Sequence, residues 1–140
     1  EMKKWLGNYQ GKAIEFSKKS AFFPLAGSLG LVLLIAVSNS VINLIFGPAY
    51  LPSTIILQVL SIGFIFFFLS TIPSSLILYY FGKPEASFII TIIRYSIFIS
   101  LLILLVPSAK ALGAAWAFTL SELLSLLLLS GYTFAKFQKK

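Results

Sequence analysis

The chain has 140 residues, of which 59% are hydrophobic and 11% are charged, and its formal net charge at pH 7 is +7. Soluble domains keep about a quarter of their residues charged, so this composition excludes an ordinary soluble domain and predicts a membrane protein. The sequence contains no cysteine and no histidine, which excludes disulfides and the usual metal-binding clusters. We therefore expect neither a cofactor nor a metal site.

The chain begins with a basic leader at residues 1–20. Its five lysines alternate with aromatic residues at Trp5, Tyr9 and Phe16. Two interpretations stay open for the leader: an interfacial helix whose lysines face anionic lipid head groups, or a cytoplasmic loop, because Gly7 and Gly11 weaken a helix. Since the lysines lie mostly outside the apolar segments, the positive charge does not indicate a partner of nucleic acid.

Four apolar segments follow, and we expect them to form one membrane domain over residues 21–140. The segments cover about 21–46, 54–81, 86–106 and 112–134. At about 1.5 Å per residue, a helix of any of these lengths crosses roughly 30 Å of hydrocarbon. The connections are short, reading GPAYLPS, GKPE and PSAKA. The sequence therefore predicts an all-α membrane protein with four antiparallel transmembrane helices.

The lysines also predict the orientation of these helices. If the leader is cytoplasmic, the turn with Lys83 and the basic C-terminal tail are cytoplasmic too, and Lys110 is the only cation of an outer loop. Cytoplasmic loops carry an excess of lysine and arginine. We therefore expect a multi-pass protein with both termini in the cytoplasm.

Two charged residues stand within the apolar segments. Arg94 lies midway along the third segment and Glu122 midway along the fourth, at equal distances from the turn at Ser108. They should share one depth in the membrane, where an unpaired charge costs several kcal/mol. Three interpretations stay open: a structural ion pair that fixes helix register, an Arg94 that contacts an anionic substrate in a water-filled cavity, or simple snorkelling. Tyr95 shares the Arg94 side of its helix.

Amides and a proline mark the first two segments. Asn39 and Asn43 lie one turn apart on one helix face, where they either bond a neighbouring helix or line a cavity. Pro73 should kink the second segment, for packing or for gating. The candidate substrate-binding residues are thus Arg94, Glu122, Asn39, Asn43 and Tyr95.

Catalytic patterns are lacking in this sequence. The four acidic residues lie at different expected depths, so they predict no paired-carboxylate site. Without histidine or cysteine, a common nucleophile-base arrangement cannot be assembled. We expect that the chain is not an enzyme.

The order of the signals along the chain resembles the C-terminal domain of polysaccharide biosynthesis membrane proteins. These are the lipid-linked oligosaccharide flippases of the multidrug/oligosaccharidyl-lipid/polysaccharide exporter superfamily. The resemblance covers nearly the whole chain. It lies in Phe46-Gly47 with Tyr50 and Pro52 after the first segment, Gly82-Lys83 after the second, Pro107 after the third, and Gly113-Ala114-Ala115 at the start of the fourth.

The resemblance implies that the chain is a fragment of a larger transporter built from two similar halves. Such a protein moves an undecaprenyl-diphosphate-linked oligosaccharide, as in O-antigen assembly, across the prokaryotic cytoplasmic (inner) membrane by alternating access. Its implied partners are this lipid-linked substrate, membrane lipids and the remaining helices of the transporter. Arg94 would then attract the diphosphate or a sugar acid, and Glu122 would hold Arg94 when the cavity is empty.

Two other classes of protein are compatible with the same residues. One is a small four-helix multidrug-type transporter that acts as a dimer, which would need a membrane carboxylate open to cationic drugs. The other is a purely structural membrane subunit, in which the polar residues only hold helices together.

Overall fold

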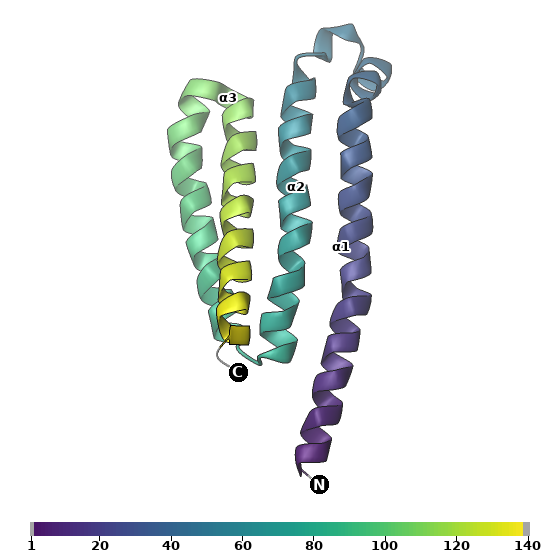
Figure 1. The fold of residues 1–140 in the computed structure, drawn as a ribbon. Helices are drawn as coiled ribbons and strands as arrows, with labels where there is room; N and C mark the ends of the chain where they lie inside the picture. The colour runs from purple at the N-terminus through teal and green to yellow at the C-terminus, as the bar shows by residue number, and fades with distance from the viewer. Residues whose placement is uncertain (1, 139–140) are drawn as a thin grey trace.

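The structure, a computed structural model, describes residues 2–138; for residues 2–14, 16–20, 80 and 137 only the backbone is described. Over this range the chain is helical and contains no strand. Figure 1 shows the order of the elements. They are α1 (Met2–Phe46), the 3-10 turn η1 (Pro48–Tyr50), α2 (Ser53–Ser75), the π-helical turn η2 (Leu76–Tyr80) and α3 (Pro84–Gln138).

Helix α1 runs without interruption from the leader into the first apolar segment. The leader backbone is helical from Met2 onward, so the interpretation of the leader as a loop is wrong; its position at a membrane surface stays a prediction. Gly7 and Gly11 do not end the helix, because a residue added to an existing helix avoids the cost of nucleation. The leader carries α1 beyond the ends of the other helices (Figure 1).

The first two predicted breaks are confirmed. At the end of α1, Gly47 has a φ of 86°, and its N–H donates to the carbonyl of Asn43 at 3.1 Å. Gly82, with a φ of 58°, lies in the turn between η2 and α3. Both are left-handed conformations, which glycine adopts without the steric cost of a Cβ atom.

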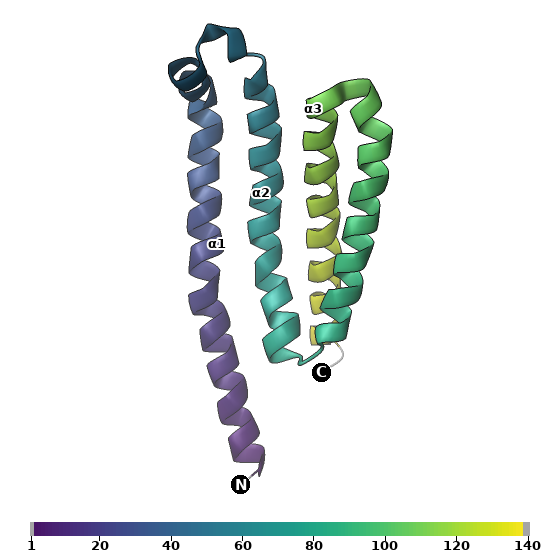
Figure 2. The same ribbon diagram turned by 180° about the vertical axis from the view of Figure 1, so that it is seen from behind.

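Helix α3 reverses its direction at Lys110, whose φ of 50° and ψ of −128° are not helical. We call residues 84–109 the first arm of α3 and residues 111–138 its second arm. Figures 1 and 2 show the two arms side by side and antiparallel. The expected end of the third segment at Pro107 is wrong, because the helix continues through Pro107 to the turn. A proline removes one backbone donor, which a membrane helix tolerates, and does not by itself reverse the chain.

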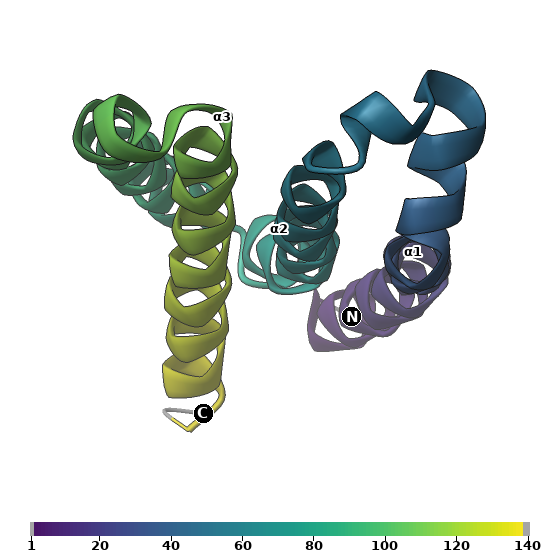
Figure 3. The same ribbon diagram turned by 90° about the horizontal axis from the view of Figure 1, so that it is seen from above.

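Three helices are long and apolar enough to cross a membrane, where the sequence predicted four. They are Ala21–Phe46, Ser53–Tyr79 and Pro84–Lys136 within the residues that the structure describes. The difference lies in α3, which contains the third and fourth predicted segments as its two arms. Seen from above, α2 lies between α1 and α3 (Figure 3). The start of α1, the connection from α2 to α3 and the end of α3 lie toward one end of the molecule, whereas the connection from α1 to α2 and the reversal within α3 lie at the other (Figure 1).

The burial pattern is the reverse of that of a soluble protein. Large apolar side chains point outward; Leu44 is 88% exposed and Leu104 is 74% exposed. The interior of the described part is instead rich in small and polar side chains, including Ser38, Ser121 and Ala117. Membrane helices pack through small residues and hydroxyl groups, because apolar side chains gain little by leaving lipid.

Small residues bring α2 and the second arm of α3 together. A Cβ atom at Gly63 would lie 2.7 Å from the Phe118 ring and 2.8 Å from the Thr119 hydroxyl. That hydroxyl donates across the helices to the carbonyl of Val59 at 2.8 Å. On the other side of α2, Gln58 donates to Ser38 of α1 at 2.9 Å. These contacts hold α2 as the central helix of the fold.

Candidate functional site

The predicted pairing of Arg94 with Glu122 is confirmed. Arg94, on the first arm of α3, donates from Nη1 to both carboxylate oxygens of Glu122 on the second arm, at 3.0 and 3.2 Å. The Arg94 side chain is 15% exposed and the Glu122 side chain is 5% exposed, so most of the pair is buried within the protein. The two arms are antiparallel and reverse at Lys110, which lies 16 residues after Arg94 and 12 residues before Glu122, so the two residues lie within about one helical turn of the same level. The pair therefore links the two arms of α3.

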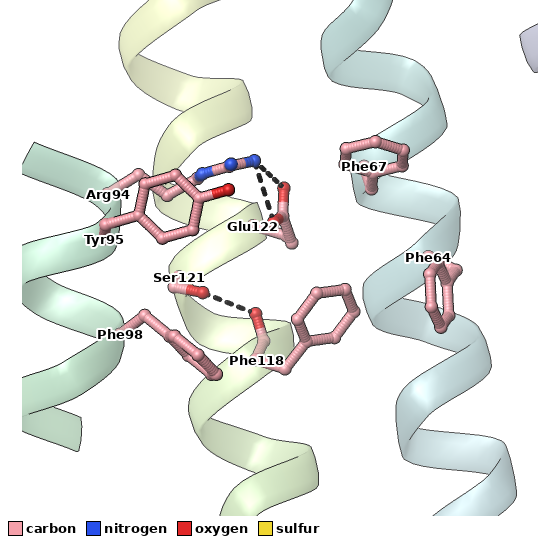
Figure 4. A pocket seen from close by; sticks show the side chains of 8 residues that line it. All are labelled: Phe64, Phe67, Arg94, Tyr95, Phe98, Phe118, Ser121 and Glu122. Atoms are coloured by element: carbon pink, nitrogen blue, oxygen red, sulfur yellow. Dashed lines mark hydrogen bonds and ion pairs between the residues drawn. The ribbon is translucent and has the colours of Figure 1, made fainter. Parts of the chain in front are cut away.

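Aromatic side chains enclose one side of this pair, as Figure 4 shows. A cavity of about 170 Å³ is lined by Arg94 and Glu122 together with aromatic rings of α2 and of both arms of α3. The Arg94 guanidinium carbon lies 4.6 Å from the centre of the Tyr95 ring, a favourable cation–π distance. The other residues that line the cavity are Phe64, Phe67, Phe98, Phe118 and Ser121.

A second cavity, of about 310 Å³, lies on the other side of Arg94. It is formed by the C-terminal part of α2, by η2 and by both arms of α3. Seven of its lining residues carry aliphatic hydroxyl groups: Ser70, Thr71, Ser74, Ser75, Ser87, Thr91 and Ser125. Arg94 thus lies between an aromatic cavity and a hydroxyl-lined cavity, and its positively charged side chain lines both.

The structure does not bring Asn39 and Asn43 to this site. Both side chains are exposed on α1, which packs on α2 and lies on the side of α2 away from α3 (Figure 3). Within the described residues they line neither cavity and bond no neighbouring helix. Of the five predicted site residues, Arg94, Glu122 and Tyr95 therefore lie together, while a binding role for the two asparagines stays a prediction.

Sequence reasoning missed most of the residues that line the two cavities. The sequence places Ser87, Thr91 and Arg94 at spacings of four and three residues, which puts them on one face of a helix. The same spacing relates Ser70 to Ser74 and Thr71 to Ser75 on α2. This repeated hydroxyl spacing could have indicated the second cavity. The phenylalanines of the first cavity carry no such signal, because phenylalanine is also frequent among the exposed residues of this chain.

Comparisons with known proteins were made for the chain as a whole. No protein-family model matches it, and no solved structure was found to match. It is 32% identical over 129 residues to the capsular polysaccharide biosynthesis protein CapF of Staphylococcus aureus. The match covers 89% of this chain and 32% of that relative, so the chain spans about a third of the relative's length. The chain is thus similar, over most of its own length, to one part of a protein named for capsular polysaccharide biosynthesis.

Proposed function

We propose that this chain is part of a membrane transporter that moves a lipid-linked oligosaccharide across the prokaryotic cytoplasmic membrane during polysaccharide biosynthesis. The observation that carries the proposal is the Arg94–Glu122 pair, which lies within apolar helices at the junction of two cavities. Charged residues within membrane helices are costly, and where they border cavities they mark substrate pathways. The name of the relative supports the link to polysaccharide biosynthesis.

The proposed role of the pair is to bind and release an anionic group. Glu122 accepts both hydrogen bonds of Arg94 Nη1. A phosphate or a sugar carboxylate that enters a cavity would compete for the guanidinium, which has further N–H donors. Translocation needs no bond to be made or broken, and we therefore propose a transporter and not an enzyme.

The proposal requires α3 to cross the membrane twice. Its apolar part, Pro84–Lys136, has 53 residues. A straight helix of that length would measure about 80 Å, well over the roughly 30 Å of the hydrocarbon layer. The reversal at Lys110 supports two crossings in place of one, and hence four in the whole chain.

Cysteine labelling tests this topology, because the chain contains no cysteine of its own. We expect Ala49→Cys, within η1, and Ala109→Cys, at the reversal, to react with a membrane-impermeant thiol reagent in intact cells. Lys83→Cys should react only after the cells are opened. Labelling of Lys83→Cys from outside would invert the predicted orientation, and protection of Ala109→Cys in opened cells as well would contradict a second crossing of α3.

The transport function is tested by depletion of the full-length protein in cells. We expect the lipid-linked oligosaccharide to accumulate with its sugars on the cytoplasmic side, because synthesis continues while translocation stops. Radiolabelled lipid extracts measure this intermediate, and a sugar-oxidising reagent applied outside measures its sidedness. Normal surface polysaccharide after depletion would contradict the proposal and favour a structural subunit, whereas increased sensitivity to cationic drugs would favour a multidrug-type transporter.

A further inference from the structure

The hydroxyl-lined cavity between α2 and the arms of α3 differs in chemistry from the aromatic cavity. Its wall contains the seven serine and threonine residues named above. Serine and threonine in a membrane helix usually bond a carbonyl of their own helix, and scattered hydroxyl groups need no other explanation. Here, however, hydroxyl-bearing residues from three segments line one volume of about 310 Å³. That volume is at the lower end of the range for ligand pockets, about 300–1,000 Å³.

Most of these hydroxyl groups already donate their proton in a hydrogen bond within the protein. Ser70 and Thr71 donate to the carbonyls of Phe67 and Phe68, at 2.7 and 2.6 Å. Thr91 donates to the carbonyl of Ser87 at 2.9 Å, on the opposite wall. A hydroxyl group has one donor and two acceptor positions, so a hydroxyl that donates to the backbone can still accept a bond. The wall of the cavity therefore presents mainly acceptors.

The hydroxyl groups of Ser75 and of the Ser74–Ser87 pair also form hydrogen bonds within the protein. Ser75 donates to the carbonyl of Thr71 at 2.6 Å. Ser74 and Ser87 lie 3.3 Å apart and share one hydrogen bond, in which either oxygen is the donor. Only one proton of these two hydroxyl groups is therefore left for a ligand.

Ser125 is the exception among these residues. Its side chain lines the cavity and the residue is only 4% exposed. Within the described part of the chain, no protein group forms a hydrogen bond with its hydroxyl. Because this hydroxyl reaches the cavity and forms no bond within the described chain, it can both donate to a ligand and accept from one. Ser125 thus offers a ligand both a donor and an acceptor.

We propose that this cavity binds one sugar ring, through hydroxyl groups of the ring that donate to the serine and threonine oxygens. Arg94, at the boundary of the cavity, would donate to an acceptor group of the same ring. A free phosphate or diphosphate fits less well, because it presents only acceptors to a wall of acceptors. The inference rests on the proposed function, in which the ring belongs to the glycan being moved, and it assigns the sugar and not the diphosphate to this cavity.

A single cysteine in the wall tests the inference in the full-length protein, made free of other cysteines and reconstituted in lipid vesicles. In Ser74→Cys, we expect methyl glucoside to slow thiol labelling several-fold, and glucuronate to slow it more because Arg94 pairs with its carboxylate. Inorganic pyrophosphate should leave the rate unchanged. Ser87→Cys serves as a second reporter if Ser74→Cys does not fold.

Two control variants show where the sugar acts. Ser108→Cys is exposed near the reversal at Lys110, at the opposite end of the arms, and its labelling should not respond to any of the three compounds. Adding Thr91→Val and Ser125→Ala to Ser74→Cys should abolish the effect of methyl glucoside, because two oxygen atoms of the wall are removed. Protection that survives these two changes would place the sugar elsewhere and overturn the inference.

The three compounds separate the possible outcomes. Equal protection by pyrophosphate would make the cavity a phosphate site and overturn the proposal. Protection by glucuronate alone would mean that only the charge of Arg94 is recognised, and the absence of any protection would mean that no sugar binds; either result contradicts a ring bound by hydroxyl groups. Because labelling does not depend on transport, its failure is distinct from a failure of depletion to block translocation.

Discussion

Replacing Arg94 by alanine in the full-length protein is expected to abolish glycan export and to lower the free energy of unfolding by about 3–5 kcal/mol, the usual cost of removing one member of a buried ion pair. The loss follows from the remaining carboxylate of Glu122, which is 5% exposed and has its hydrogen bonds from Arg94. Export is measured by surface polysaccharide, and stability by thermal unfolding in detergent. Arg94→Lys should keep part of the activity, since it retains the charge but loses the planar guanidinium.

A charge-matched double variant separates the structural from the functional role of the pair. Arg94→Ala combined with Glu122→Gln removes both charges, so we expect most of the lost stability to return. Export should stay absent if Arg94 contacts the substrate. Full recovery of export in the double variant would show that the pair serves only to hold the two arms of α3 in register.

The single variant Glu122→Gln should damage the fold at least as much as Arg94→Ala. A carboxyl group that loses its partner can take up a proton and become neutral, whereas a guanidinium group cannot lose its proton. Arg94 would therefore remain charged among apolar and aromatic residues. The same unfolding measurement compares the two variants, and a clearly milder effect of Glu122→Gln would contradict this account.

Gly113→Ala is expected to destabilise the hairpin of α3 by about 1–3 kcal/mol or more, which is the typical cost of overpacking. A Cβ atom at Gly113 would meet the carbonyl group of Leu105 and the backbone nitrogen of Val106 on the first arm. Backbone atoms cannot rotate away as a side chain can, so the two arms would have to separate near Lys110. Thermal unfolding and the yield of protein in the membrane measure the effect.

Gly30→Ala is the matched control for this prediction. Nothing lies within 4 Å of a Cβ atom built at Gly30, which is exposed on α1. Alanine is favoured over glycine inside a helix by about 0.5–1 kcal/mol, so stability should be unchanged or slightly higher. Equal destabilisation by the two substitutions would show that the close approach of the arms at Gly113 is not what matters.

Several features of this protein were predictable because they depend on counting along a helix. Arg94 and Glu122 are equally distant from Ser108, and although the chain reverses two residues later, at Lys110, this count still brings the two residues within about one helical turn of the same level. No knowledge of any other helix is needed for this prediction. The contact of Arg94 with Tyr95 is likewise local, because the two residues are neighbours in the sequence.

The asparagines of α1 show what residue spacing along one helix cannot predict. Asn39 and Asn43 were placed on one face of α1 by their spacing, but which face meets α2 depends on the rotation of α1 about its axis. In a soluble helix the apolar stripe determines that rotation. Here nearly every face is apolar, so small differences such as the bond from Gln58 to Ser38 decide it.

The sequence by itself determined that the chain is a helical protein suited to a membrane, where its apolar segments lie, and that Glu122 is within reach of Arg94 as a partner. These follow from hydropathy, helix length and the cost of an unpaired charge, which are all local properties. Only the tertiary structure decided that the chain reverses at Lys110, that the asparagines lie apart from Arg94, and that hydroxyl groups of three segments line one cavity. Those features depend on how apolar helices rotate and approach one another, which in lipid is set by small residues and interhelical hydrogen bonds and not by a hydrophobic stripe.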